Sequence, residues 1–212
     1  MTVQELYEQC QLSILSEELL RSSEPFSCGS TEDERDLNEF LYNDALLYQK
    51  KLIGKTYVFT RKQSAAEPMH PKQIVTFFTL ANDSIRLTNK MTETIRQQFL
   101  EDTDLRDKDT KRFPGVLLGR LGTNERFSGQ GYGSAVMEFI KTMFITQNKT
   151  GCRFIIVDAL NNERTIKYYK HNGFQFLIDD ETQEAKYVGI GLSHLPLNTR
   201  LMYFDLLTLQ IE

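Results

Sequence analysis

The sequence contains no long apolar run, and none of its apolar stretches approaches the roughly 18 residues that a membrane-spanning helix requires. Its first residues, MTVQELYEQ, are acidic and lack the basic and apolar regions of a secretory signal peptide. Cysteine is scarce: only Cys10, Cys28 and Cys152 occur, in an odd number and at spacings that fit no metal site. We therefore expect a cytoplasmic protein with reduced thiols, no membrane association and no bound metal.

An excess of positive charge is also absent, because the 212 residues carry a net charge of −4. This balance argues against strong non-specific binding to nucleic acid. The segment 163–171 does gather four basic side chains, and we interpret it as a solvated helix face rather than a binding patch. The length and an apolar share of 40% predict a single globular domain over residues 1–212.

Hydrophobic periodicity predicts a mixture of helices and strands. Residues 4–21 favour a helix, although the interpretation of 12–15 stays open between helix and strand. We expect further helices at 36–50, 91–100, 132–147 and 162–171, and strands at 57–60, 74–80, 115–122, 153–159 and 174–178. Residues 187–192 and 201–209 alternate enough to be strands that close the sheet.

A glycine-rich stretch, RFSGQGYG at 126–133, lies between an apolar run at 115–121 and a helical pattern at 134–141. Strand, glycine-rich turn and helix together hold phosphate. Glycine lets successive N–H groups point at one anion, and the helix start adds N–H groups without partners. Arg126 adds a formal positive charge beside them. The stretch lacks the Gly-Lys-Ser/Thr ending of a P-loop and the G-x-G-x-x-G spacing of a dinucleotide site.

A second motif follows the apolar run at 154–157, which is typical of a buried strand. Asn162 is expected to cap the N-terminus of the next helix, and Gly173 to end that helix as its C′ residue. Tyr168 and Tyr169 lie near the end of this predicted helix.

The two motifs together resemble those of the GNAT superfamily of N-acetyltransferases. The family's pyrophosphate loop reads Arg/Gln-x-x-Gly-x-Gly/Ala, so Gly131 and Gly133 match its small positions, and Ser128 stands where Arg or Gln is usual. Its second motif reads Asn-x-x-Ala-x-x-(aromatic or Leu)-Tyr-x-x-x-Gly-Phe, and here Thr165 replaces Ala. Similarity scattered over 26–174 extends to the branch that includes the aminoacyl-tRNA-acetylating toxins.

The resemblance implies an α+β fold of the three-layer α/β type. A mixed, mostly antiparallel central sheet would be flanked by helices and contain a splayed pair of parallel strands. Acetyl-CoA would be the co-substrate, with its pantetheine arm in the gap between those strands. Main-chain contacts to the arm would come from Leu121, Gly122 and Thr123, and a further contact from Asn162. The pyrophosphate would be held by Gly129, Gly131, Gly133 and Ser134, with Arg126 or Gln130 compensating for Ser128.

The same resemblance makes Tyr169 the general acid. A phenol, whose ordinary pKa is about 10, can donate a proton to the departing thiolate. Tyr168 is expected to pack in the core instead. No general base is evident: four polar residues near predicted strand ends are each interpreted as structural, namely Asp83, Ser84, Glu125 and Asp158. The three histidines fit no triad or metal pattern, namely His70, His171 and His194.

These observations predict an acetyl-CoA-dependent N-acetyltransferase that acts on a primary amine by direct attack. The acceptor stays open between an aminoacyl-tRNA, a peptide and a small metabolite. The toxin-like similarity favours the first, and the acidic charge weakens that choice. Candidate partners are therefore tRNA and a second copy of the chain. The alternative is a catalytically silent module that binds acyl-CoA or a partner, against which the intact Tyr169 and both motifs argue.

Overall fold

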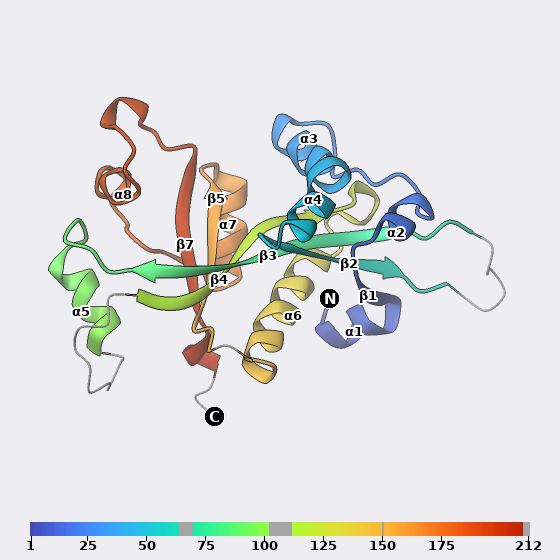
Figure 1. Ribbon diagram of the computed structural model, residues 1–212, viewed down its shortest axis with the longest axis horizontal. Coiled ribbons are helices and arrows are strands. Elements are labelled where there is room, and N and C mark those ends of the chain that lie inside the picture. Colours follow the sequence, from blue (N-terminus) through green and yellow to red (C-terminus); the bar gives the residue numbers. More distant parts are fainter. Residues whose placement is uncertain (64–69, 102–111, 150, 210–212) are drawn as a thin grey trace. The chain divides into compact units, whose positions relative to one another are not determined.

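The computed structural model describes residues 1–63, 70–101, 112–149 and 151–209. Its strands form a seven-stranded mixed sheet in the order β1-β2-β3-β4-β5-β7-β6 (Figure 1). β4 and β5 are parallel, whereas β1–β2, β2–β3, β5–β7 and β6–β7 are antiparallel. The expected mostly antiparallel sheet with one parallel pair is therefore confirmed.

The helices and strands have the following bounds. The α-helices are α1 Val3–Gln9, α2 Glu17–Arg21, α3 Glu32–Glu39, α4 Ala45–Lys50, α5 Glu93–Glu101, α6 Tyr132–Thr146, α7 Glu163–His171 and α8 Glu181–Val188. The strands are β1 Cys10–Ile14, β2 Lys55–Arg61, β3 Ile74–Arg86, β4 Arg112–Thr123, β5 Phe154–Leu160, β6 Gln175–Phe176 and β7 Thr199–Asp205. In the described part of the chain, no helix has both the length and the apolar character that a membrane span requires.

The chain divides into two compact units, and the first comprises Met1–Asn82 and Leu118–Thr146. One of its cores packs apolar side chains of α3, α4 and the intervening turn against β2 and β3. Buried Phe77 lies edge-on to Phe26, with ring centroids 5.4 Å apart, and stacks on Phe40 at 6.5 Å. Thr31 starts α3 with a capping box, in which its hydroxyl accepts from the Glu34 N–H and Glu34 reaches back to the Thr31 N–H. This unit contains the glycine-rich loop.

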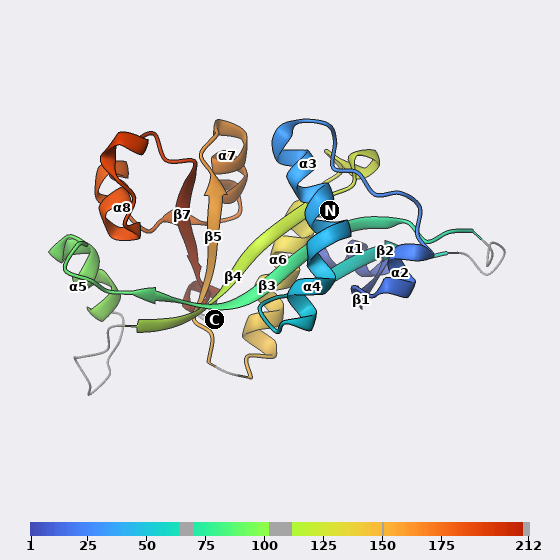
Figure 2. The same cartoon turned by 45° about the horizontal axis from the view of Figure 1, so that its top comes forward.

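The second unit comprises Asp83–Leu117 and Gln147–Glu212 and has an aromatic core. The rings of Phe99, Phe113, Phe154 and Tyr203 lie 5.3–6.1 Å apart by their centroids. β5 is the central strand of this core. It pairs with β4 from Gly115↔Phe154 to Leu117↔Ile156 and with β7 along its whole length. Figure 2 shows α7 beside β5, and the motif that contains Tyr169 follows this strand directly.

The N-terminal prediction needs correction. The sequence pattern predicted one helix over residues 4–21. The structure instead has α1, then strand β1, then α2. β1 pairs antiparallel with β2 from Cys10↔Arg61 to Ile14↔Tyr57. This pairing also decides the open interpretation of residues 12–14 in favour of strand. Backbone hydrogen bonds to a neighbouring strand outweigh a weak local preference for helix.

The prediction of a strand at 187–192 is wrong. Tyr187 and Val188 are the last residues of α8, and Gly189 ends that helix in the left-handed conformation at φ 83°. The Asp180 side chain caps the start of α8 by accepting from the Gln183 N–H. The predicted strand at 201–209 is real but shifted, since β7 covers 199–205 and a 3₁₀ turn follows. The helix expected at 36–50 begins earlier, at Glu32, and contains a π-helical turn at 40–44.

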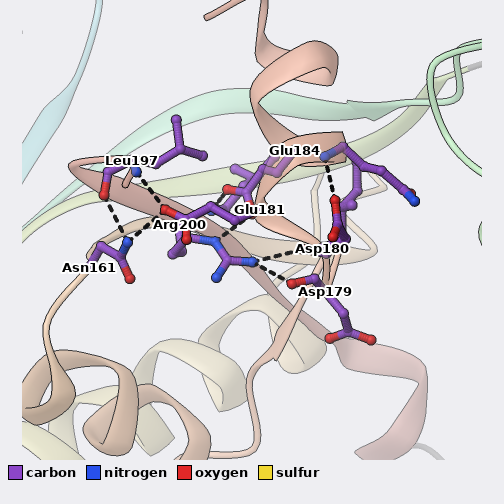
Figure 3. Close-up of polar contacts among 10 residues, drawn as sticks. Asn161, Asp179, Asp180, Glu181, Glu184, Leu197 and Arg200 are labelled. Atoms are coloured by element: carbon purple, nitrogen blue, oxygen red, sulfur yellow. Dashed lines mark hydrogen bonds and ion pairs between the residues drawn. The ribbon is translucent and has the colours of Figure 1, made fainter. Parts of the chain in front are cut away.

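A buried ion pair fastens α8 to β7. The Arg200 Nε donates to the Glu184 Oε2 at 2.7 Å, and the side chains are only 8% and 2% exposed (Figure 3). The Nη2 of the same guanidinium group donates to the main-chain oxygens of Ile178 at 3.0 Å and Asp179 at 2.9 Å. The Arg200 guanidinium also lies 4.2 Å from the centre of the Phe176 ring. Three of the five N–H donors of Arg200 thus have partners inside the unit.

Removing one partner of this pair should be costly. Arg200→Met is expected to lower the free energy of unfolding by about 3–5 kcal/mol, because it leaves the Glu184 carboxyl buried without its cation. The measurement is urea denaturation followed by circular dichroism. The matched control is Arg21→Met, which breaks the exposed Arg21–Glu17 pair and should cost well under about 1 kcal/mol. Equal losses of unfolding free energy in the two variants would show that the buried Arg200–Glu184 pair matters no more for stability than an exposed one.

Candidate active site

The glycine-rich loop connects the end of β4 to the start of α6. Asn124 anchors it from a buried position: its Nδ2 donates to the Ile74 carbonyl at 3.3 Å, and its Oδ1 accepts from the Arg126 N–H at 3.1 Å. After the 3₁₀ turn at 125–127, Gly129 and Gly131 have φ values of 74° and 87°. Only glycine adopts this conformation without strain, so the sequence dictates the shape of the turn.

The loop is open at Gly129, whereas a Cβ on Gly131 would lie 3.1 Å from the Met1 nitrogen. A Cβ on Gly129 would meet no atom within 4 Å, and Ser128, Gly129 and Gln130 are all exposed. α6 begins at Tyr132 and has 15 residues, so a full helix dipole and the N–H groups of its first turn lie at this end. Left-handed glycines before a helix start form a concave group of N–H donors. The geometry therefore fits the pyrophosphate of acetyl-CoA.

The end of β4 is packed tightly on one side. A Cβ on Gly122 would lie 2.5 Å from a ring carbon of Phe77 and 2.8 Å from the Cys28 sulfur, so no larger residue fits. The Thr76 hydroxyl donates to the Gly122 carbonyl at 2.9 Å and lies 3.5 Å from the Thr123 hydroxyl. Packing alone explains the glycine at 122. The predicted contacts of 121–123 with the pantetheine arm stay predictions.

The side chains expected to compensate for Ser128 have partners within the protein. Arg126 is exposed and forms an ion pair with Glu24 at 2.7 Å, and Glu24 also accepts from Gln73. Gln130 donates its amide to the Arg126 carbonyl at 3.0 Å. These contacts favour a structural role for both side chains, and their contact with phosphate stays a prediction.

Tyr169 lies in the last turn of α7, whose two ends have the predicted caps. The Asn162 Oδ1 accepts from the Thr165 N–H at 2.9 Å, so this side chain has a capping role whether or not it also contacts pantetheine. At the other end Gly173 has a φ of 79°, and the Phe174 N–H bonds back to the Tyr169 carbonyl at 3.0 Å. The helix end therefore holds the Tyr169 backbone firmly.

The Tyr169 ring packs edge-on against Tyr168 and Phe174, with ring centroids 5.2 Å and 5.3 Å away. Burial raises the pKa of Tyr169 to about 12, and the negative charge of Asp158 contributes to the rise. The phenol therefore keeps its proton at neutral pH, which is the state that a general acid requires. Burial also raises the pKa of Tyr168. Its side chain is only half-buried, so the predicted core role stays a prediction.

Asp158 and Asp83, two of the four residues considered as a general base, interact electrostatically in the second unit. Partial burial raises the pKa of Asp158, and the negative charge of Asp83 raises it further. Asp158 is on β5 and lines a cavity, whereas Asp83 accepts the Ser84 N–H at 2.7 Å. Glu125 lies in the 3₁₀ turn of the first unit, where its N–H donates to the Ser27 carbonyl. The sequence alone did not single out Asp158, because its neighbours come from distant segments.

Histidine contributes no comparable cluster. Within the described ranges, no three His, Cys, Asp or Glu side chains gather closely enough to hold a metal ion. Cys10, Cys28 and Cys152 are all free thiols.

Residues 100–174 match the model of the acetyltransferase (GNAT) family, and this segment contains β4, the glycine-rich loop, α6, β5 and α7. The segment is therefore similar to the GNAT acetyltransferases, as its two motifs predicted, and the sheet around it is GNAT-like. No curated protein sequence matches the chain.

Solved structures of toxins have the same fold. A mutant of KacT superposes with a TM-score of 0.64 at 18% identity, over 95% of this chain and 98% of that one. AtaT complexed with acetyl-methionyl-tRNAfMet gives a TM-score of 0.64 at 20% identity, over 95% and 98%. AtaTR bound with acetyl-CoA gives 0.62 at 20% identity, over 96% and 98%. At these identities the similarity establishes the fold.

Ser134 offers a test of the loop that avoids the strained glycines. Ser134→Glu places a carboxylate in the first turn of α6, where the helix dipole stabilises it, so folding should be unaffected. The same carboxylate would repel a phosphate, and acetyl-CoA affinity should fall at least about 10-fold, or roughly 1.4 kcal/mol. Calorimetry with acetyl-CoA measures this, with Ser134→Ala as the uncharged control. Wild-type affinity in Ser134→Glu would exclude the loop as the phosphate site.

Proposed function

We propose that this protein transfers an acetyl group from acetyl-CoA to a primary amine by direct attack, with Tyr169 as the general acid. The observation that carries this proposal is the half-buried, protonated phenol on α7, whose ring packs between Tyr168 and Phe174. Tyr169 lies within the same GNAT-matching segment as the glycine-rich loop. Acetyl-CoA supplies the activated acetyl thioester when bound. The chain must bind it, orient the amine and manage the protons.

Binding falls to the first unit in this proposal. The N–H groups around Gly129, Gly131, Gly133 and Ser134 hold the pyrophosphate. Main-chain groups of 121–123 orient the pantetheine arm, and one of their N–H groups stabilises the charge that develops on the thioester oxygen. Since Arg126 pairs with Glu24, the loop binds mainly through its backbone.

Proton transfer falls to the second unit. An acceptor in the ammonium form must lose one proton before it can attack, and Asp158 accepts that proton. Its raised pKa makes its carboxylate a stronger base than an ordinary aspartate. As the nitrogen–carbon bond replaces the carbon–sulfur bond, the sulfur leaves with the bonding electron pair and takes the Tyr169 proton. The second proton lost by the nitrogen returns to Tyr169. One proton is released overall, through Asp158.

Tyr169→Phe tests the acid. The substitution keeps the ring and its packing and removes only the hydroxyl, so turnover should fall by roughly 10²–10⁴-fold. Acetyl-CoA affinity should change little, because the loss affects mainly the transition state. Steady-state thiol release with an amine panel measures turnover, and thermal melting verifies folding.

Tyr168→Phe is the matched control, since Tyr168 precedes Tyr169 in α7 and its ring packs against that of Tyr169. It should retain nearly full turnover. Equal turnover in the two variants would remove Tyr169 from the mechanism. Acetyl-CoA binding without thiol release for any amine would favour the catalytically silent module.

A second, narrower candidate function is the acetylation of an aminoacyl-tRNA. It is favoured by the similar fold of AtaT in complex with acetyl-methionyl-tRNAfMet. The net charge of −4 limits the phosphate contacts that the chain can make, so any tRNA contact must come from local basic groups such as those of α7.

This candidate predicts that expression in a bacterial host arrests growth, and that Tyr169→Phe relieves the arrest while Tyr168→Phe does not. In vitro, a charged tRNA pool should acquire acetyl groups on the α-amines of its aminoacyl ends, measured by mass spectrometry after ribonuclease digestion. Acetylation of free amines with no acetylation of any charged tRNA would reject this acceptor and leave the acetyltransferase proposal intact.

A further inference from the structure

The second unit contains two adjoining cavities, of about 340 Å³ and about 550 Å³, which share Ile190, Leu197 and Thr199 in their walls. The smaller is mostly apolar: its lining includes Val188, Ile190, Leu197 and Leu201, together with the carboxyls of Asp158 and Glu184. The lining of the larger also includes His194 and Asn198. The volume of the smaller cavity falls at the lower end for small-molecule sites.

Two polar networks hold the walls of the smaller cavity (Figure 3). The Arg200–Glu184 pair joins α8 to β7, so the end of α8 at Val188 is fixed relative to Leu201. The Asn161 amide donates to the Leu197 carbonyl at 2.8 Å and to the Glu181 carboxylate at 3.0 Å. This second network ties the segment before β7 to both α8 and the end of β5. The cavity is therefore preformed.

The two carboxyls in the lining differ in their electrostatic state. Glu184 is buried, and its charge is balanced by Arg200 at 2.7 Å. Within the described ranges no cation pairs with Asp158, and the nearby Asp83 adds a second negative charge. A cationic group in the cavity would therefore be attracted to Asp158, and an anionic group would be repelled.

We propose that the smaller cavity is the acceptor site and takes a primary amine with a compact apolar side chain. The amine lies at Asp158, the side chain packs against Val188, Ile190 and Leu197, and the rest of the acceptor extends into the larger cavity. This assignment rests on the proposed acetyltransferase function and narrows its substrate class. Asp158 is the residue that links the cavity to the chemistry, because it is also the group whose charge acts on Tyr169.

The test uses four small probes. Leucinamide has the amine and a compact apolar side chain, glycinamide lacks the side chain, and glutamic acid α-amide has an anionic one. 4-Methylpentanamide keeps the side chain of leucinamide and lacks the amine. We expect leucinamide to exceed glycinamide and glutamic acid α-amide in kcat/KM by at least roughly 10-fold, the usual discrimination of an apolar pocket. Binding of all four is measured separately by NMR titration of the full chain.

Two variants locate the site. Val188→Phe should fill the cavity from an exposed position and weaken leucinamide binding at least about 10-fold. Leu207→Phe is the matched control, because Leu207 is similarly exposed and lines neither cavity. Asp158→Asn should weaken the binding of leucinamide and leave the binding of 4-methylpentanamide unchanged, because only leucinamide carries a cationic amine.

The outcomes separate this inference from the proposed function. Equal kcat/KM for the three amines, or leucinamide binding that Val188→Phe does not change, overturns the acceptor site while acetyl transfer stands. Selective, Val188-dependent binding of leucinamide without acetyl transfer to any amine supports the cavity as an amine site and rejects the acetyltransferase. Absence of leucinamide binding to the wild type overturns the assignment directly.

Discussion

The hydrogen bonding of β5 is the constraint on which the rest of the second unit depends. Its first three residues pair with β4 on one side and β7 on the other, whereas the β4 ladder ends at Ile156 and the β7 ladder continues to Leu160. The strand is thereby fixed at its buried start, and in its second half Asp158 and Leu160 are exposed while Ala159 stays buried. Asp158, the end of the strand and the cap of α7 all follow within a few residues, so the pairing of β5 with its neighbours fixes where they lie.

Apolar and polar interactions have separate roles around that strand. The aromatic cluster that includes Phe99, Phe154 and Tyr203 supplies burial, the main favourable contribution to folding. The ion pair between Arg200 and Glu184 contributes less net stability, since its Coulomb attraction is offset by the desolvation of two charges. What it adds is position: α8 can occupy only the place where Glu184 meets Arg200 and the Leu201 N–H.

Local signals made some elements predictable. Asn162 and Gly173 bracket a helix by capping chemistry that acts over three or four residues, so the sequence placed α7 and Tyr169 correctly. The glycines at 129 and 131 likewise indicated a left-handed turn before a helix.

Helix α8 was missed because the alternation around Tyr187 resembles a strand. The cap at Asp180 and the glycine at 189 were signals that favoured a helix. The partners of Arg126 and Arg200 come from residues 102 and 16 positions away, which no local pattern reveals. The cavity beside Asp158 depends in the same way on segments that only the fold brings together.

The tight packing at Gly122 makes the reactivity of the neighbouring Cys28 thiol sensitive to the opening of the first unit at this point. The Cys28 sulfur occupies the space where a side chain at 122 would lie, and the Cys28 N–H is held by the Asn38 side chain at 2.8 Å. Burial raises the pKa of the Cys28 thiol to about 12, with Glu34 and Glu125 adding to the rise, so little thiolate is present at neutral pH. Because Cys28 is only half-buried, a thiol reagent reaches its sulfur more easily when the segment before α3 separates from the end of β4. A change in the labelling rate of Cys28 therefore reports a change in the opening of that strand end, with a native side chain as the reporter.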